Sequence, residues 1–241
     1  MSGVIKSMHN IKINRNELKY YIPYKEYIVL SNLLKKIFQK DKYHKESLGG
    51  YLVRSLYFDT IDNKSFEDKV GGIEERSKYR LRIYDTHSKS VKFEIKSKTN
   101  YIITKETAII SRNDAEEIQK TNYEVMLKYN NEVLNKVYIE FKKRSYYPVV
   151  LVEYLRVAFL YDANKIRVVF DRFLKSTPLQ LDLFTDTVFM PQLKKDIVIM
   201  EIKYDNFIPM WIKQLLQVPS FERSAISKYV IGRLDTFGTL I

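Results

Sequence analysis

Cysteine is absent from this 241-residue chain, and glycine, proline and histidine are scarce, with 7, 6 and 3 copies. Without cysteine there can be no disulfide, no thiolate metal ligand and no cysteine nucleophile. The histidines His9, His44 and His87 are far apart in the sequence and lack the spacing of a zinc site. These absences argue against zinc and thiol chemistry.

Long apolar runs are missing too. No segment approaches the roughly 20 apolar residues that a membrane-spanning helix needs, and residues 1–6 lack the hydrophobic stretch of a secretory signal peptide. We therefore expect a soluble, cytoplasmic protein without a membrane span. The sequence leaves the oligomeric state open, and it is compatible with a membrane-bound partner.

Positive charge and aromatic residues are abundant. Lys and Arg number 41 against 29 Asp and Glu, which gives a net charge of +12, and 14% of the residues are aromatic. This composition is typical of a folded protein with an anionic partner. The basic residues are dispersed singly through strand-like segments and form no nucleic-acid-binding motif, so we expect no nucleic acid partner. Surface binding of nucleic acid is an alternative that only the net charge supports.

Residues 76–84 and 93–98 alternate between charged and apolar side chains. The two-residue period of a β-strand places them on opposite faces of a sheet: Arg80, Arg82, Glu94 and Lys96 against Leu81, Ile83, Phe93 and Ile95. Taken alone, this pattern is typical of a half-solvated antiparallel hairpin.

Other segments extend this pattern to the whole chain. Strand character recurs at residues 17–22, 51–60, 101–107, 149–160, 165–173 and 196–205, while helical patterns cover 24–40, 65–70, 111–144, 209–216 and 221–234. No repeat or linker divides these segments. The sequence predicts a single α+β domain over residues 1–241.

Three of the strands carry Glu-x-Lys: Glu17 with Lys19, Glu94 with Lys96 and Glu201 with Lys203. Each pair alone is more typical of an exposed ion pair that contributes little stability. If the strands form one sheet curled on itself, their charged faces converge on an interior. Nine cations would line it: Lys19, Arg80, Arg82, Lys96, Lys105, Arg156, Arg167, Lys203 and Lys228.

This interior would hold fewer carboxylates than cations. The carboxylates are Glu17, Glu94, Asp171 and Glu201. Desolvated, unpaired charges are costly, and a bound polyanion would remove the cost. Glu201 suits a hard divalent cation whose other ligands are water and phosphate. For Asp171 we expect a role in orienting Arg167 rather than in binding metal.

The order of these motifs resembles a known family. The motifs are Lys19-Tyr20, residues 55–60, residues 80–84, Glu94-Ile95-Lys96 with a later Lys105, residues 156–159, residues 167–171, Glu201-Ile202-Lys203 and Ser227-Lys228-Tyr229. Together they resemble the VTC (vacuolar transporter chaperone) domain, the polyphosphate polymerase branch of the CYTH-like triphosphate tunnel metalloenzymes. The resemblance runs from about Glu17 to about Arg233.

The resemblance implies an antiparallel β-barrel tunnel with flanking and plugging helices. It implies an enzyme that moves the γ-phosphate of ATP onto a growing polyphosphate chain with Mn²⁺ or Mg²⁺. Carried over by position, the catalytic set is Arg80, Arg82, Lys96, Arg156 and Glu201, with Glu201 as the metal ligand. Further phosphate contacts would be Lys19, Lys105, Arg167, Lys203, Ser227, Lys228 and Tyr229.

Two other functions fit the same tunnel: a tripolyphosphatase or nucleoside triphosphatase, and a polyphosphate-binding module without turnover. The wider tunnel superfamily carries Glu-x-Glu-x-Lys on its first strand, and Arg15 stands at the first Glu position here. The loss of that metal-binding carboxylate argues against a plain triphosphatase and against an adenylate-cyclase-like enzyme.

Overall fold

The computed structural model describes residues 16–100, 102–188 and 190–236, and its main element is a nine-stranded antiparallel sheet. The strands are β1 (Asn16–Pro23), β2 (Gln39–Lys40), β3 (Tyr51–Asp59), β4 (Arg76–Ile83), β5 (Ser90–Thr99), β6 (Ile102–Ser111), β7 (Tyr147–Tyr161), β8 (Ile166–Thr177) and β9 (Ile197–Tyr204). Their order is β1-β9-β8-β7-β3-β4-β5-β6, and β2 pairs with β7. Each strand predicted from the sequence has a counterpart in this sheet.

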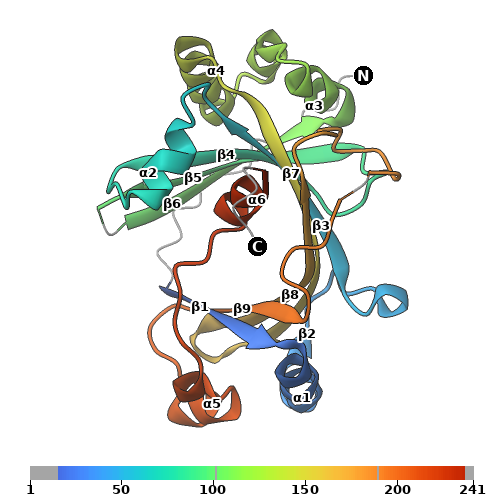
Figure 1. Cartoon of the computed structure of the whole chain (residues 1–241), viewed down its shortest axis with the longest axis vertical. Helices are drawn as coiled ribbons and strands as arrows, with labels where there is room; N and C mark the ends of the chain where they lie inside the picture. The colour runs from blue at the N-terminus through green and yellow to red at the C-terminus, as the bar shows by residue number, and fades with distance from the viewer. Residues whose placement is uncertain (1–15, 101, 189, 237–241) are drawn as a thin grey trace.

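Six α-helices accompany the sheet in the described ranges. They are α1 (Tyr24–Leu34), α2 (Lys64–Val70), α3 (Arg112–Gln119), α4 (Glu132–Arg144), α5 (Met210–Leu215) and α6 (Lys228–Thr236). A 3-10 helix, Tyr123–Tyr129, joins α3 to α4 and completes the predicted helical insertion. Figure 1 shows α3 and α4 at one end of the molecule and α1 and α5 at the other.

The sheet bends around α6, which stands inside the curve (Figure 1). The predicted antiparallel sheet with a helix inside its curve is therefore present, but the strand ladder is not closed. In the described part of the chain, the edge strands β1 and β6 do not pair with each other. A side-chain bridge spans the gap instead, because Lys96 Nζ on β5 lies 3.2 Å from Glu17 Oε2 on β1.

The free edge of β1 pairs with Arg223 and Ser224, in the segment before α6. Tyr20 forms an isolated antiparallel bridge with Arg223, and the Ser224 amide donates to the Lys19 carbonyl at 3.0 Å. The predicted helix over 221–234 is therefore wrong in its first half, and α6 begins only at Lys228. Backbone pairing with a strand edge satisfies the same amide groups that a helix would use.

The predicted helix over 24–40 is also too long. It ends at Leu34, and Gln39 and Lys40 pair with Leu160 and Phe159 of β7. Phe38, between the two segments, is buried in the apolar cluster under α1. Burial of this ring and the strand pairing outweigh local helix propensity, which is a weak preference.

The apolar side of the β3–β6 half packs outward against α3 and α4. Leu81 and Phe93 are fully buried there, and the Phe93 ring lies 5.9 Å from that of Phe141 on α4. In the β4–β5 ladder, Arg80 is directly opposite Glu94 and Lys78 is opposite Lys96. The predicted separation into an apolar and a charged face is confirmed, and the charged face turns into the curve of the sheet.

Gly232 lets α6 lie against the inner face of the sheet. A Cβ atom at this position would come 3.1 Å from Val152 Cγ2 and 3.3 Å from Ser176 Cβ. Such contacts are closer than a packed interior tolerates without displacement. The glycine therefore fixes the depth of α6, and with it the positions of Lys228 and Tyr229 at the start of the helix.

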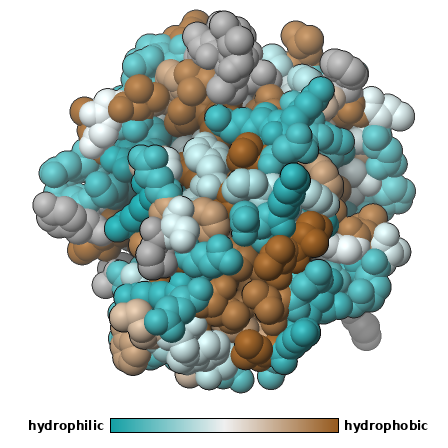
Figure 2. All heavy atoms as spheres, turned by 60° about the horizontal axis from the view of Figure 1, so that its bottom comes forward, coloured by the Kyte–Doolittle hydropathy of each residue, from teal (hydrophilic) through white to brown (hydrophobic). Residues whose placement is uncertain are grey.

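Figure 2 shows the end of the molecule that carries α1 and α5, where apolar side chains form a patch between hydrophilic ones. Large apolar side chains exposed on these helices include Ile28, Val29, Met210 and Trp211. Trp211 packs one side of its ring against Tyr161, at a centroid distance of 5.5 Å. No helix within the described ranges has the length and apolar character needed to cross a membrane.

Candidate phosphate-binding tunnel

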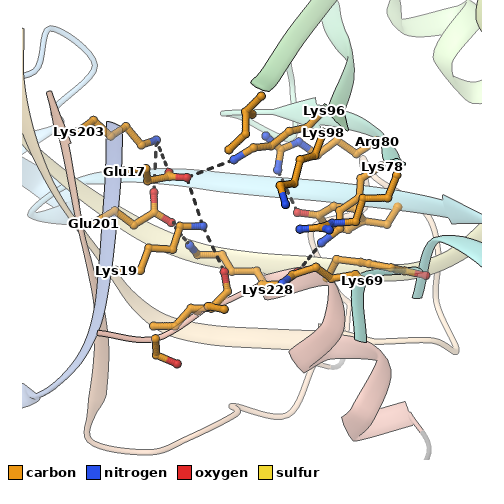
Figure 3. A pocket seen from close by; sticks show the side chains of 18 of the residues that line it. Glu17, Lys19, Lys69, Lys78, Arg80, Lys96, Lys98, Glu201, Lys203 and Lys228 are labelled. Carbon is orange, nitrogen blue, oxygen red and sulfur yellow. Dashed lines mark hydrogen bonds and ion pairs between the residues drawn. The ribbon is translucent and has the colours of Figure 1, made fainter. Parts of the chain in front are cut away.

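A cavity of about 460 Å³ lies inside the curved sheet and is strongly basic. Its lining contains two carboxylates, Glu17 and Glu201, and twelve cations: Lys19, Lys69, Arg76, Lys78, Arg80, Arg82, Lys96, Lys98, Arg156, Lys203, Arg223 and Lys228. Figure 3 labels several of these charged residues around the same space, among them Glu17, Lys78 and Glu201. Distant parts of the chain therefore meet in one charged interior.

Glu94 fixes the two arginines of β4. Its carboxylate is almost fully buried, and it lies 2.7 Å from Arg80, 3.5 Å from Arg82 and 2.5 Å from Lys105. Arg80 also donates to the Tyr57 hydroxyl at 3.0 Å, and Arg82 to Ser55 Oγ at 3.2 Å. Burial would raise the pKa of Glu94, but the three cations hold it well below its usual range.

Asp171 and Glu201 fix Arg156 and Lys228. Asp171 accepts two hydrogen bonds from Arg156, at 2.7 and 2.8 Å, and its second oxygen lies 2.6 Å from Lys228 Nζ. Two parallel bonds of this kind hold a guanidinium in one orientation. Asp171 therefore orients Arg156, and our expectation that it orients Arg167 is wrong.

Glu201 stands among four cations. Lys228 lies at 2.8 Å, Lys203 at 3.3 Å, and Lys19 and Arg156 at 3.9 Å each. Burial acts to raise the pKa of Glu201, but these cations bring it well below its usual range. The pKa of Glu17 is shifted in the same direction. Burial acts to raise it, but Lys19, Lys203 and Lys96 lower it to about 2. Both carboxylates are therefore ionised at neutral pH.

Ten of the twelve residues predicted from the sequence line this cavity. They are Lys19, Arg80, Arg82, Lys96, Arg156, Glu201, Lys203, Ser227, Lys228 and Tyr229. Tyr229 contributes its ring, which lies beneath Lys78, while its hydroxyl donates to Asp59. Ser227 Oγ accepts from Lys78 Nζ at 2.7 Å.

Lys105 and Arg167 are not among the lining residues. Lys105 pairs with Glu94, the carboxylate that also holds Arg80 and Arg82. Arg167 bonds to Asp41 at 2.6 Å and to the Tyr51 hydroxyl at 3.0 Å. Tyr51 packs edge to face against Tyr84, which follows β4, so Arg167 is bonded to a member of an aromatic cluster rather than to the cavity.

A family model for the VTC domain matches residues 14–237. The chain belongs to the VTC domain family. No curated protein matches it in sequence. Among solved structures, a putative adenylyl cyclase from Hippeastrum, described as having a dominant triphosphatase activity, is 14% identical with a TM-score of 0.55, over 94% of this chain and 96% of that one.

A second solved structure with this fold is a putative adenylate cyclase from Bacillus halodurans. It is 12% identical with a TM-score of 0.50, and the match covers 93% of the VTC domain chain and 99% of the other. At such identities the likeness shows the fold alone. The VTC domain thus has the tunnel fold that the sequence motifs implied, with a ladder open between β1 and β6.

The sequence reasoning missed five cations of the VTC domain cavity: Lys69, Arg76, Lys78, Lys98 and Arg223. The two-residue alternation that selected Arg80 and Lys96 also contains Arg76, Lys78 and Lys98, so these three could have been found. Lys69 lies on α2, and Arg223 lies in the segment paired with β1. No local pattern indicates that either of them faces the tunnel.

The carboxylates that the VTC domain cavity offers to a divalent cation are Glu17 and Glu201. Lys203 Nζ lies 3.4 Å from Glu17 and 3.3 Å from Glu201, so one ammonium lies between the two. One or two carboxylates are enough for Mg²⁺ or Mn²⁺ when phosphates complete the coordination. The donor set therefore fits such a cation, although no group of three potential ligands occurs in the described ranges. Arg15, which stands at the first Glu position of the superfamily motif, lies outside the described ranges.

Acid is expected to destabilise the VTC domain through these carboxylates. A carboxylate with a lowered pKa in the folded state adds stability above its unfolded pKa, and this stability is lost as the pH falls. For Glu17 the window runs from 4.5 down to about 2, a loss of roughly 3 kcal/mol. Thermal melting between pH 7 and pH 2 covers this window. The melting temperature of a Glu17→Gln protein should fall less over this pH range than that of the wild type. An equal fall in both proteins would contradict this assignment.

Proposed function

We propose that this VTC domain is a polyphosphate polymerase that transfers the γ-phosphate of ATP to the end of an inorganic polyphosphate chain. The observation that carries the proposal is the set of guanidinium groups held in place by buried acids around one cavity. Arg80 and Arg82 are fixed by Glu94, and Arg156 by Asp171. Phosphoryl transfer needs alignment and charge neutralisation more than it needs covalent help from the protein.

The proposed roles follow from charge and position. Arg80, Arg82, Lys96 and Arg156 bind the reacting phosphates, and Lys19, Lys203, Ser227 and Lys228 line the remainder of the chain's path. A bound Mn²⁺ or Mg²⁺ would be held by Glu201 with Glu17 beside it, and would neutralise charge on the γ-phosphate. No general base is required, because a terminal phosphate oxygen is already ionised at neutral pH.

Because the cations are fixed before the substrate arrives, little reorganisation accompanies the reaction. Groups held in this way stabilise developing charge more effectively than mobile ones. Burial would lower the pKa of Arg156, but contact with Asp171, Tyr154 and Glu201 raises it well above its usual range. The guanidinium is thus charged at every pH at which the protein is folded.

The direct test is product analysis. Purified protein with ATP and Mn²⁺ or Mg²⁺, with and without a short polyphosphate primer, is expected to give a polymer ladder on a gel and one ADP for each phosphate added. Release of free phosphate without polymer would instead assign a triphosphatase, the activity described for the Hippeastrum protein. Polyphosphate binding without ADP formation would leave a binding module.

A further inference from the structure

Two groups among the cations of the tunnel differ in their partners. Lys19, Lys96, Lys203, Lys228 and Arg156 each lie within 4 Å of Glu17 or Glu201. A second group, which we call the outer cluster, consists of Lys69, Arg76, Lys78 and Lys98. Across residues 16–100, 102–188 and 190–236, no carboxylate pairs with any of these four. Figure 3 shows Lys69, Lys78 and Lys98 on the side of the cavity opposite Glu17, Glu201 and Lys203.

Three elements supply the outer cluster. Lys69 is in the last turn of α2, Arg76 and Lys78 are on β4, and Lys98 is on β5 directly opposite Arg76. Like charges that face each other across a sheet are destabilising. The cluster nevertheless lines the same cavity as the cations within 4 Å of Glu17 or Glu201, which we call the paired group, and its four side chains are half-buried. Such an arrangement fits an anion that supplies the missing negative charge.

Lys78 lies at the centre of the cluster. Facing it are Lys69 on α2, Lys96 on β5, Lys19 on β1 and Arg76 on its own strand. Its Nζ donates to Ser227 Oγ and lies 5.5 Å from the centre of the Tyr229 ring. Burial, followed by repulsion from the four cations, lowers the pKa of Lys78 to about 6. At neutral pH the empty tunnel therefore keeps this amine largely uncharged.

The two groups suit different forms of a polyphosphate. A metal-bound triphosphate needs carboxylates near the metal, and only the paired group supplies them. The outer cluster offers ammonium and guanidinium donors alone, which fit phosphate oxygens that carry no metal. We propose that the outer cluster is a second anion subsite that holds the phosphoryl acceptor, the metal-free end of a polyphosphate or oligophosphate. This inference rests on the proposed function.

With ATP in one subsite and the acceptor in the other, the γ-phosphate is transferred in a single displacement. An ionised terminal oxygen of the acceptor forms a bond to the γ-phosphorus of ATP. The bond from that phosphorus to the β,γ-bridging oxygen breaks, and its electron pair leaves on ADP. The acceptor gains one phosphate unit and needs no oxidant and no base. Water lacks the charge that the outer cluster recognises, so the subsite favours polymer growth over hydrolysis.

Calorimetric binding of two probes tests the subsite without any turnover. Tripolyphosphate in EDTA represents the metal-free acceptor, and a magnesium-bound, non-hydrolysable ATP analogue represents the donor. The double variant Lys69→Gln/Lys98→Gln should bind tripolyphosphate at least tenfold more weakly and the analogue less than threefold more weakly. The matched control Lys120→Gln/Lys128→Gln removes the same charge from two exposed surface lysines. Equal weakening of both probes, or of neither, would overturn the second subsite.

Proton uptake provides an independent readout. At pH 7.5, binding of tripolyphosphate should recharge Lys78 and take up a proton, which is measured as a dependence of the binding heat on the buffer. Lys78→Met should lose this uptake and melt at a higher temperature than the wild type, which shows that it is folded. Uptake that persists in Lys78→Met would overturn the role given to Lys78. A protein that binds both probes but makes no polymer would refute the polymerase while supporting the subsite.

Discussion

Replacing Arg82 by alanine is expected to reduce polymer formation from ATP by about 10²- to 10³-fold, the usual loss when one fixed donor to a charged transition state is removed. Arg82 is buried, and its guanidinium donates to Ser55 and contacts Glu94. Its position therefore depends on protein groups that are in place before the substrate binds. A mobile water molecule in the vacated space would be a poor substitute.

The fold should tolerate this change. Glu94 keeps Arg80 at 2.7 Å and Lys105 at 2.5 Å after Arg82 is removed, so no buried carboxylate loses all its partners. We expect a melting temperature close to that of the wild type together with the loss of activity. Arg144→Ala is the control, because Arg144 is exposed, pairs with Glu140 on α4 and does not line the cavity. Polymer formation at the wild-type rate by Arg82→Ala would refute the catalytic set.

Strand periodicity predicted most of the tunnel wall because the wall is made of regular strands. Once β4 and β5 are paired in register, every second residue must face the interior, and Arg80, Arg82 and Lys96 follow from the printed sequence. The same reasoning fails where the wall is irregular. Arg223 enters the cavity because its segment pairs with the edge of β1, and that pairing involves residues about 200 positions apart in the sequence.

Arg167 shows a different limit of periodicity. In the ladder it lies opposite Lys203, which does line the cavity, so the face was correctly predicted. Its long side chain turns instead to Asp41, in the loop that follows β2. A pattern along one strand fixes the direction in which a side chain leaves the backbone, but not the partner that a flexible side chain meets. The partner depends on loops that carry no periodic signal.

Glu94→Gln is expected to have the largest effect on stability. The substitution keeps the shape of the side chain and removes the charge that compensates Arg80, Arg82 and Lys105. Breaking a buried ion pair by removing one partner costs about 3–5 kcal/mol. In a chain of this size, each kcal/mol lowers the melting temperature by roughly 2–4 °C. The melting temperature of Glu94→Gln should therefore fall by roughly 6–20 °C.

Polyphosphate should reverse much of this loss. In Glu94→Gln the negative charge of a ligand replaces the missing carboxylate, so the ligand should raise the melting temperature of the variant by more than it raises that of the wild type. Stabilisation by a ligand that binds only the folded state increases with its affinity. The control is Glu116→Gln, which removes a charge from an exposed helix pair with Arg112. A Glu94→Gln protein that melts within a degree of the wild type would mean that the guanidinium groups are stabilised by solvent, and the claim that this buried carboxylate fixes Arg80 and Arg82 would fail.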